Sequence, residues 1–230
     1  MNRYSKITDK IKREIVLLKA YPCIWGKCSF CDYILDNSSK EEEIIKTNKE
    51  VLKNITGEFK VLEVINSGSC FEIPKETLLL IKEIIKEKKI ERLFLESHWA
   101  YKNKIKEMRG FFEIPITFKI GVETFDYEFR NSVLNKNAKF NTVEELKEYF
   151  DSPCIMVGIK GQTKEMIAKD LDILLNNFDH GTINVFVNNS TNIKRDNELV
   201  KWFTKEYKDI LDKNEKIEVL YNNTDFGVGD

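Results

Sequence analysis

The sequence of 230 residues has no apolar run that approaches the roughly 18 residues a membrane-spanning helix needs. Its first residues, MNRYSKITDKIKREI, lack the apolar stretch of a signal peptide. We therefore expect a cytoplasmic protein without a membrane partner. A basic excess is also missing, because 37 Lys and Arg residues are balanced by 38 Asp and Glu residues. This balance speaks against nucleic acid as a partner and favours a small-molecule substrate.

Cysteine and histidine are scarce, with five and two residues respectively. Three of the cysteines, Cys23, Cys28 and Cys31, fall within the short segment CIWGKCSFC. In a reducing compartment, clustered cysteines bind metal or do chemistry more often than they form disulfides. A closed zinc site needs four ligands, and Cys70 is the candidate for the fourth. A zinc-stabilised α/β binding module without enzymatic activity is therefore one alternative.

Short β-branched runs alternate along the chain with charged segments whose apolar residues recur at helical spacing. They predict seven strands, at residues 15–21, 61–66, 92–96, 116–122, 154–159, 183–187 and 217–221. Strands that alternate with helices imply a parallel sheet, either open or closed into a partial barrel. No linker rich in Gly, Pro or Ser divides the chain, so we expect one domain over residues 1–230. In such folds the site lies at the carboxyl ends of the strands.

Three local patterns predict where helices begin. Ser39 and Glu42 have the spacing of a capping box, in which each side chain bonds to the other residue's backbone. Thr142 and Glu145 repeat that spacing. Pro74 suits the first position of a helix, where its missing N–H has no partner to lose.

The cysteine loop, residues 23–31, directly follows the first predicted strand. Its spacing is Cys-x4-Cys-x2-Cys, with Phe30 before the last cysteine. This resembles the Cys-x3-Cys-x-aromatic-Cys loop of the radical S-adenosylmethionine (SAM) superfamily, with one extra residue in the first interval. The resemblance implies that Cys23, Cys28 and Cys31 hold a 4Fe–4S cluster with one iron open for chemistry. It also implies an α/β fold: a partial (β/α)6 barrel of parallel strands with a further C-terminal strand.

Three more stretches resemble SAM-binding segments of that superfamily: INSGSC (65–70), IGVET (120–124) and MVGIKGQTKEM (156–166). By resemblance, the residues that contact SAM are Phe30, Ser67, Gly68, Ser69, Glu96, Glu123 and Ile159. The same resemblance implies that an electron from the cluster cleaves SAM and that the resulting 5′-deoxyadenosyl radical takes a hydrogen atom from the substrate. A donor such as flavodoxin or ferredoxin would supply the electron.

Polar residues at the strand ends and beside the cysteine loop are the candidates for substrate binding: Asp32, Tyr33, His98, Asn188, Asn189 and Asp225. Amides and carboxylates can recognise a base-like heterocycle through paired hydrogen bonds, although they also cap loops routinely. No side chain stands out as catalytic.

The short chain, the altered cysteine interval and the Asn-rich strand ends resemble the queuine lyases of queuine salvage. This resemblance implies a lyase that cleaves the free base queuine to its 7-aminomethyl-7-deazaguanine precursor. A radical SAM enzyme for another small molecule, a peptide or a tRNA base is the other alternative.

Overall fold

A computed structural model describes residues 2–222, which form two compact units. Among these residues the first unit comprises 2–26 and 33–118, and the second comprises 27–32 and 119–222. The cysteine loop contributes to both units, Cys23 to the first and Cys28 and Cys31 to the second. The expectation of one domain over residues 1–230 stays a prediction.

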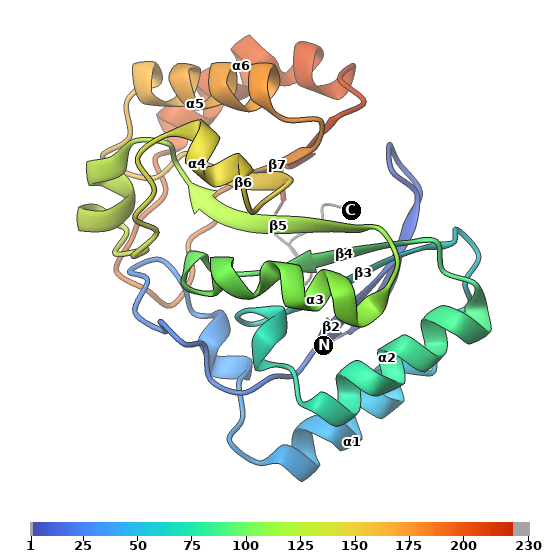
Figure 1. Cartoon of the computed structure of the whole chain (residues 1–230). Coiled ribbons are helices and arrows are strands. Elements are labelled where there is room, and N and C mark those ends of the chain that lie inside the picture. Colours follow the sequence, from blue (N-terminus) through green and yellow to red (C-terminus); the bar gives the residue numbers. More distant parts are fainter. Residues whose placement is uncertain (1, 223–230) are drawn as a thin grey trace. The chain divides into compact units, whose positions relative to one another are not determined.

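The first unit contains four strands in the order β1-β2-β3-β4. The strands are β1 (Tyr4–Ile7), β2 (Arg13–Leu18), β3 (Val61–Asn66) and β4 (Arg92–Glu96). β2 is antiparallel to β1 and parallel to β3, which is parallel to β4. The α-helices are α1 (Glu41–Leu52), α2 (Lys75–Lys88) and α3 (Ile105–Phe112), and the short 3-10 helices are η1 (Tyr33–Asp36), η2 (Cys70–Glu72) and η3 (Trp99–Lys104). α1 and α2 pack side by side, and α1 contacts β2 (Figure 1).

The second unit repeats the parallel arrangement with strands β5 to β8. These are β5 (Ile116–Glu123), which enters the unit at Lys119, β6 (Ser152–Val157), β7 (Gly181–Val185) and β8 (Ile217–Leu220). The helices are the π-helix η4 (Phe129–Val133), α4 (Val143–Lys147), α5 (Lys164–Asn177) and α6 (Asn197–Asp212). α5 packs on β6 and α6 on β8 (Figure 1). All pairings in this unit are parallel, with an irregular register between Gly121 and Glu123.

All seven predicted strands are present, although their bounds shift, most where predicted residues 15–21 correspond to Arg13–Leu18. The eighth strand within residues 2–222, β1, was not predicted. Its sequence, YSKI, has only one β-branched residue and is only half-buried, so it lacks the apolar run that revealed the others. β1 pairs antiparallel with β2, so this additional strand departs from the parallel arrangement that was predicted for the other strands.

The predicted capping box at Ser39 is wrong. Helix α1 begins at Glu41, with Lys40 at its N-cap and no side-chain cap. Ser38 takes the local acceptor role instead, because its Oγ accepts a hydrogen bond from the Lys40 N–H at 3.2 Å. A hydroxyl two residues ahead of an N–H forms this kind of turn readily, so the serine pair was ambiguous in sequence.

The other two helix starts were predicted more closely. Thr142 caps α4, and its Oγ1 accepts a hydrogen bond from the Glu145 N–H at 3.2 Å. The Glu145 carboxylate accepts from the N–H of Asn141, one residue earlier than a capping box requires. Pro74 occupies the N-cap of α2, one position before the first helical residue, Lys75.

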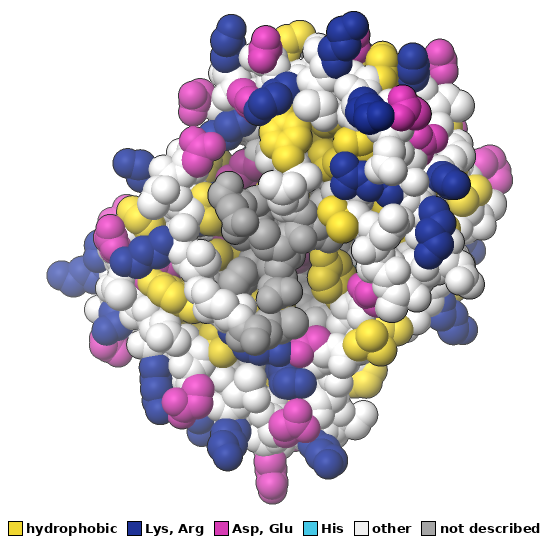
Figure 2. All heavy atoms as spheres, turned by 180° about the vertical axis from the view of Figure 1, so that it is seen from behind, with side chains coloured by type: hydrophobic (Ala, Val, Ile, Leu, Met, Phe, Trp, Pro, Cys, Tyr) yellow, Lys and Arg dark blue, Asp and Glu magenta, His cyan; other side chains and the backbone are white. Residues whose placement is uncertain are grey.

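No helix within residues 2–222 combines the length and the apolar character needed to cross a membrane. On the face drawn in Figure 2, Lys and Arg side chains are interspersed with Asp and Glu over the described surface. This mixture is typical of a solvated surface.

Candidate active site

The five cysteines divide by burial. Cys23, Cys28, Cys31 and Cys154 are half-buried, and none of the five forms a disulfide. Cys70 is fully buried, and burial raises the pKa of its thiol, which disfavours the thiolate form. Within residues 2–222, no three His, Cys, Asp or Glu side chains already gather as ligands around a metal ion would. Three half-buried thiols outside disulfides nevertheless match the donor set of a cluster with one open iron.

In the first unit, the buried Glu72 holds the chain next to Cys23. Glu72 Oε1 accepts a hydrogen bond from the Ile24 N–H at 2.6 Å, and its Oε2 accepts from the Ser69 N–H at 2.6 Å. Its backbone carbonyl accepts from the Tyr21 N–H at 3.0 Å. Burial raises the pKa of Glu72, and the hydrogen bonds from Ser69 and Ile24 oppose that shift. Sequence reasoning missed this residue, although Ser69 and Glu72 have the spacing of a capping box.

The turn after β3, residues 67–69, requires glycine at its centre. A Cβ atom added to Gly68 would lie 2.1 Å from Glu72 Oε2 and 3.4 Å from the Cβ of Cys23. Only a residue without a side chain allows the turn, the carboxylate and the first cysteine to approach this closely. In the first unit, the structure thus brings the predicted SAM turn and the first predicted cluster ligand together.

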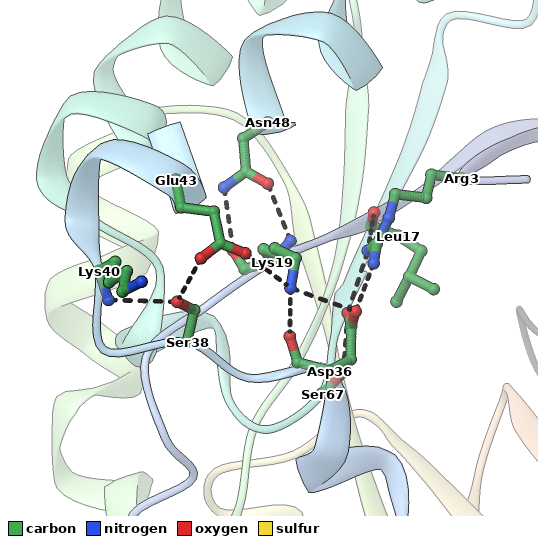
Figure 3. A network of polar contacts seen from close by, with 9 residues as sticks. All are labelled: Arg3, Leu17, Lys19, Asp36, Ser38, Lys40, Glu43, Asn48 and Ser67. Carbon is green, nitrogen blue, oxygen red and sulfur yellow. Dashed lines mark hydrogen bonds and ion pairs between the residues drawn. The ribbon is translucent and has the colours of Figure 1, made fainter. Parts of the chain in front are cut away.

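Ser67, on the same turn, faces a network of charges (Figure 3). Its Oγ donates to Asp36 Oδ2 at 3.4 Å. Asp36 also accepts a hydrogen bond from Arg3 Nη1 at 3.0 Å, and Lys19 Nζ lies 3.6 Å from its Oδ1. Lys19 Nζ further donates to the Asp36 carbonyl at 3.0 Å. This network, which local sequence did not signal, fastens η1 to the ends of β2 and β3 in the first unit.

Ser69 and His98, predicted to bind SAM and substrate respectively, are neighbours and both buried. Ser69 Oγ accepts a hydrogen bond from the His98 N–H at 2.8 Å, and His98 Nδ1 accepts from the Ala100 N–H at 3.1 Å, which caps η3. Glu96 ends β4 and is half-buried, whereas the Tyr33 side chain is exposed. These residues all lie at the carboxyl ends of the first unit's strands or directly after the cysteine loop.

In the second unit, Cys28 and Cys31 pack against an apolar cluster. The buried members of the cluster are Phe30, Phe129, Leu134, Met156, Ile159 and Phe186. Phe30 and Ile159, two predicted SAM contacts, therefore lie in one cluster with the two cysteines. The backbone holds this part of the loop as well, because the Ser29 N–H donates to the Leu134 carbonyl at 2.9 Å.

Glu123 ends β5 and forms an ion pair with Lys136, with 2.6 Å between Oε1 and Nζ. Its backbone is left-handed, with φ at 64°, which is uncommon for a residue other than glycine. Lys136 Nζ also lies 5.5 Å from the centre of the Phe30 ring. Lys136 was not predicted from the sequence, because no local motif singles it out.

Two predicted substrate residues, Asp32 and Asn189, bond to each other. Asn189 Nδ2 donates to Asp32 Oδ1 at 3.2 Å and to the Phe30 carbonyl at 2.7 Å. Ser190 Oγ donates to Asp32 Oδ2 at 2.9 Å. Asn188 is exposed and accepts a hydrogen bond from the Arg195 N–H at 2.8 Å. The last candidate, Asp225, lies outside the described residues.

No known family model matches the chain. Over its full length, the chain is 62% identical to the queuine lyase from Clostridium spiroforme bound to SAM and queuine, with a TM-score of 0.97 and complete coverage of both chains. Methylornithine synthase (PylB) is 16% identical, with a TM-score of 0.55 over 89% of this chain and 64% of that one, a likeness of fold alone.

Among curated proteins, the uncharacterized protein MJ0550 of Methanocaldococcus jannaschii is 26% identical over 144 residues. The match covers 54% of this chain and 39% of that relative, so the chain spans less than half of the relative's length.

A three-cysteine loop directly after a buried parallel strand, followed by a Ser-Gly-Ser turn after the next strand, defines a radical SAM enzyme, and the full-length match confirms the predicted radical SAM fold class. The 62% identity over the complete chain to a queuine lyase identifies the family within this class. The chain belongs to the queuine lyase family.

Proposed function

We propose that this protein is a radical SAM lyase that cleaves free queuine to 7-aminomethyl-7-deazaguanine, with a 4Fe–4S cluster and SAM as cofactors. The observation that carries the proposal is the 62% identity, over the whole chain, to a queuine lyase bound to SAM and queuine. The half-buried cysteines support it, because the loop offers three thiols outside disulfides.

In this proposal, Cys23, Cys28 and Cys31 hold the cluster. When bound, the cluster and SAM would supply radical chemistry for hydrogen abstraction from the substrate. Cys70 is fully buried and is not among the residues that would hold the cluster, so three cysteines would be its protein ligands.

The chain's own residues bind and orient the SAM molecule. Gly68, at the centre of the 67–69 turn, has no side chain, so the backbone groups of this turn can bind the methionyl part of SAM. The apolar side chains of Phe30 and Ile159 exclude water, which strengthens electrostatic interactions beside them. Glu123, whose charge is balanced by Lys136, offers a carboxylate to the ribose of SAM. Glu96 is the remaining residue that is predicted to contact SAM.

For the substrate, Tyr33 offers an exposed aromatic ring on which a heterocycle can stack. Asp32 and Asn189 support each other's orientation, as His98 is supported by its cap on η3. Asn188 and Asp225 complete the proposed substrate residues. A flavodoxin or ferredoxin supplies the electron, and a reducing, cytoplasmic environment keeps the thiols available.

The test is anaerobic reconstitution with iron and sulfide, followed by incubation with SAM, reductant and queuine. We expect a cluster chromophore, 5′-deoxyadenosine formation that queuine accelerates, and the deazaguanine product by mass spectrometry. Queuine that neither disappears nor accelerates SAM cleavage would overturn the substrate. Zinc without iron or sulfide after anaerobic purification would favour the binding module instead.

A further inference from the structure

One carboxylate in the first unit connects three segments that follow different strands. Glu72 accepts hydrogen bonds from the backbone beside Cys23, through Ile24, and from the 67–69 turn, through Ser69. Tyr101, in the segment after β4, lies near the same carboxylate, and burial together with the negative charge of Glu72 raises the pKa of its hydroxyl. The side chain is only 5% exposed, so these protein groups surround it almost completely.

We propose that Glu72 is a positioning residue that fixes Cys23 and the 67–69 turn relative to each other, and so sets the first cluster ligand against the SAM-binding backbone. The inference rests on the proposed function. Both Glu72 oxygens are engaged by the backbone at 2.6 Å, so the residue acts through its neighbours and not by touching a reacting atom.

The geometry requires a carboxylate at this position. The two N–H groups that face Glu72 need one acceptor oxygen each, and a carboxylate supplies two. Glutamine has a single oxygen, so its amide NH2 would point at one of the N–H donors and push it away. The packing around Gly68 is already close, because a Cβ atom added there would lie 2.1 Å from Glu72 Oε2. Any shift of this carboxylate must therefore move the turn or the segment beside Cys23.

The first unit contains a matched control in Glu14, at the opposite, amino end of β2. Glu14 is also fully buried and accepts hydrogen bonds from two backbone N–H groups, those of Thr56 and Gly57, at 2.7 Å each. It also accepts hydrogen bonds from the hydroxyls of Tyr4, at 2.7 Å, and Thr56, at 3.0 Å. Glu14→Gln therefore makes the same chemical change at the end of the strand that carries no site.

The experiment compares wild type, Glu72→Gln and Glu14→Gln after anaerobic reconstitution. We expect both variants to lower the melting temperature, and only Glu72→Gln to raise the KM for SAM, by about tenfold, with a smaller loss in kcat. Electron paramagnetic resonance of the reduced cluster reports the same effect without turnover: added SAM changes the spectrum of wild type and Glu14→Gln at concentrations that leave Glu72→Gln unchanged.

If Glu72→Gln does not fold, Tyr101→Phe provides the milder variant, because it removes the hydroxyl near the same carboxylate and leaves both backbone bonds. We then expect a raised KM for SAM that Tyr4→Phe does not reproduce. Equal KM values and spectra in the matched variants overturn the inference while wild type remains active. A wild type that neither assembles a cluster nor cleaves SAM overturns the proposed function instead.

Discussion

The two ends of the cysteine loop are held in different ways. At the first end, in the first unit, a single buried carboxylate, Glu72, accepts two short backbone hydrogen bonds beside Cys23 and the 67–69 turn. At the second end, in the second unit, Cys28 and Cys31 rest on an apolar cluster. Half-buried polar groups around Asp32 and Asn189 add hydrogen bonds there.

The two ends of the cysteine loop differ in how far their structure depends on a single side chain. When a buried carboxylate is replaced, its backbone N–H donors lose their acceptor. The unsatisfied N–H groups then remain away from water, which lowers the free energy of unfolding. Hydrogen bonds at half-exposed positions can be replaced by water, and packing spread over six apolar residues has no single critical contact. We therefore expect the first end to tolerate substitution poorly and the second end to tolerate polar substitution well.

The largest effect on cluster assembly should come from replacing the cysteines. It tests whether the first end supplies one cluster ligand, Cys23, or two, Cys23 and Cys70. Alanine at Cys23, Cys28 or Cys31 should reduce the iron content of reconstituted protein to background and abolish SAM cleavage. Cys70→Ala should keep the cluster, at a stability cost of about 1 kcal/mol for the small cavity. Loss of iron in Cys70→Ala would contradict this division of the cysteines.

The second unit also contains a buried carboxylate, Asp170, which can be compared with Glu72 of the first unit. It is 2% exposed, and its Oδ1 accepts a hydrogen bond from the Phe125 N–H at 2.7 Å, directly after β5. Burial raises the pKa of Asp170 from 3.8 to about 6. The folded protein therefore binds a proton between about pH 4 and pH 6 that the unfolded chain releases, and stability falls as the pH rises through that window.

Asp170→Asn removes this titration. Relative to wild type, its free energy of unfolding should rise by up to about 3 kcal/mol between pH 4 and pH 7. Denaturant unfolding at several pH values measures the difference. Asp172→Asn, at an exposed position of the same helix, is the control and should give a nearly constant difference. A constant difference for Asp170→Asn as well would show that its carboxyl is not perturbed.

Gly68→Ala tests the close packing at the first end. The added Cβ collides with Glu72 Oε2, so we expect a loss of about 1–3 kcal/mol in the free energy of unfolding. In Glu72→Ala the collision is absent, so Gly68→Ala should cost less in that background. Gly110→Ala in α3 is the matched control, because its Cβ meets no atom within 4 Å and should stabilise the helix by up to about 1 kcal/mol. Additive effects of Gly68→Ala and Glu72→Ala would contradict the contact.

The smallest effect is expected at the second end. Asn189→Ala removes the hydrogen bonds to Asp32 and to the Phe30 carbonyl, and should lower the free energy of unfolding by about 1 kcal/mol or less. The KM for SAM should change by less than about twofold, because water can replace the lost bonds at a half-buried position. A rise in this KM as large as that of Glu72→Gln would remove the contrast between the two ends.

Several features of this protein follow from local sequence. The seven apolar runs identified seven of the eight strands in residues 2–222, and Thr142 identified the start of α4, because periodicity and capping act over a few residues. The cysteine spacing identified the radical SAM class, because the three predicted ligands of the cluster lie within a single loop. Strand β1 escaped because its half-buried sequence has no apolar run, and Ser39 misled because Ser38 beside it offers the same hydroxyl.

The sequence by itself therefore determined the class of fold and the family resemblance, and it predicted the loop that binds a cluster. Only the tertiary structure decided which side chains support that loop. Glu72 is 48 residues from Ile24, and Asn189 is 157 residues from Asp32. Such hydrogen bonds arise because the ends of different strands and the loops that follow them meet in space, and no local pattern records which of many Glu, Asn and Lys residues will arrive there.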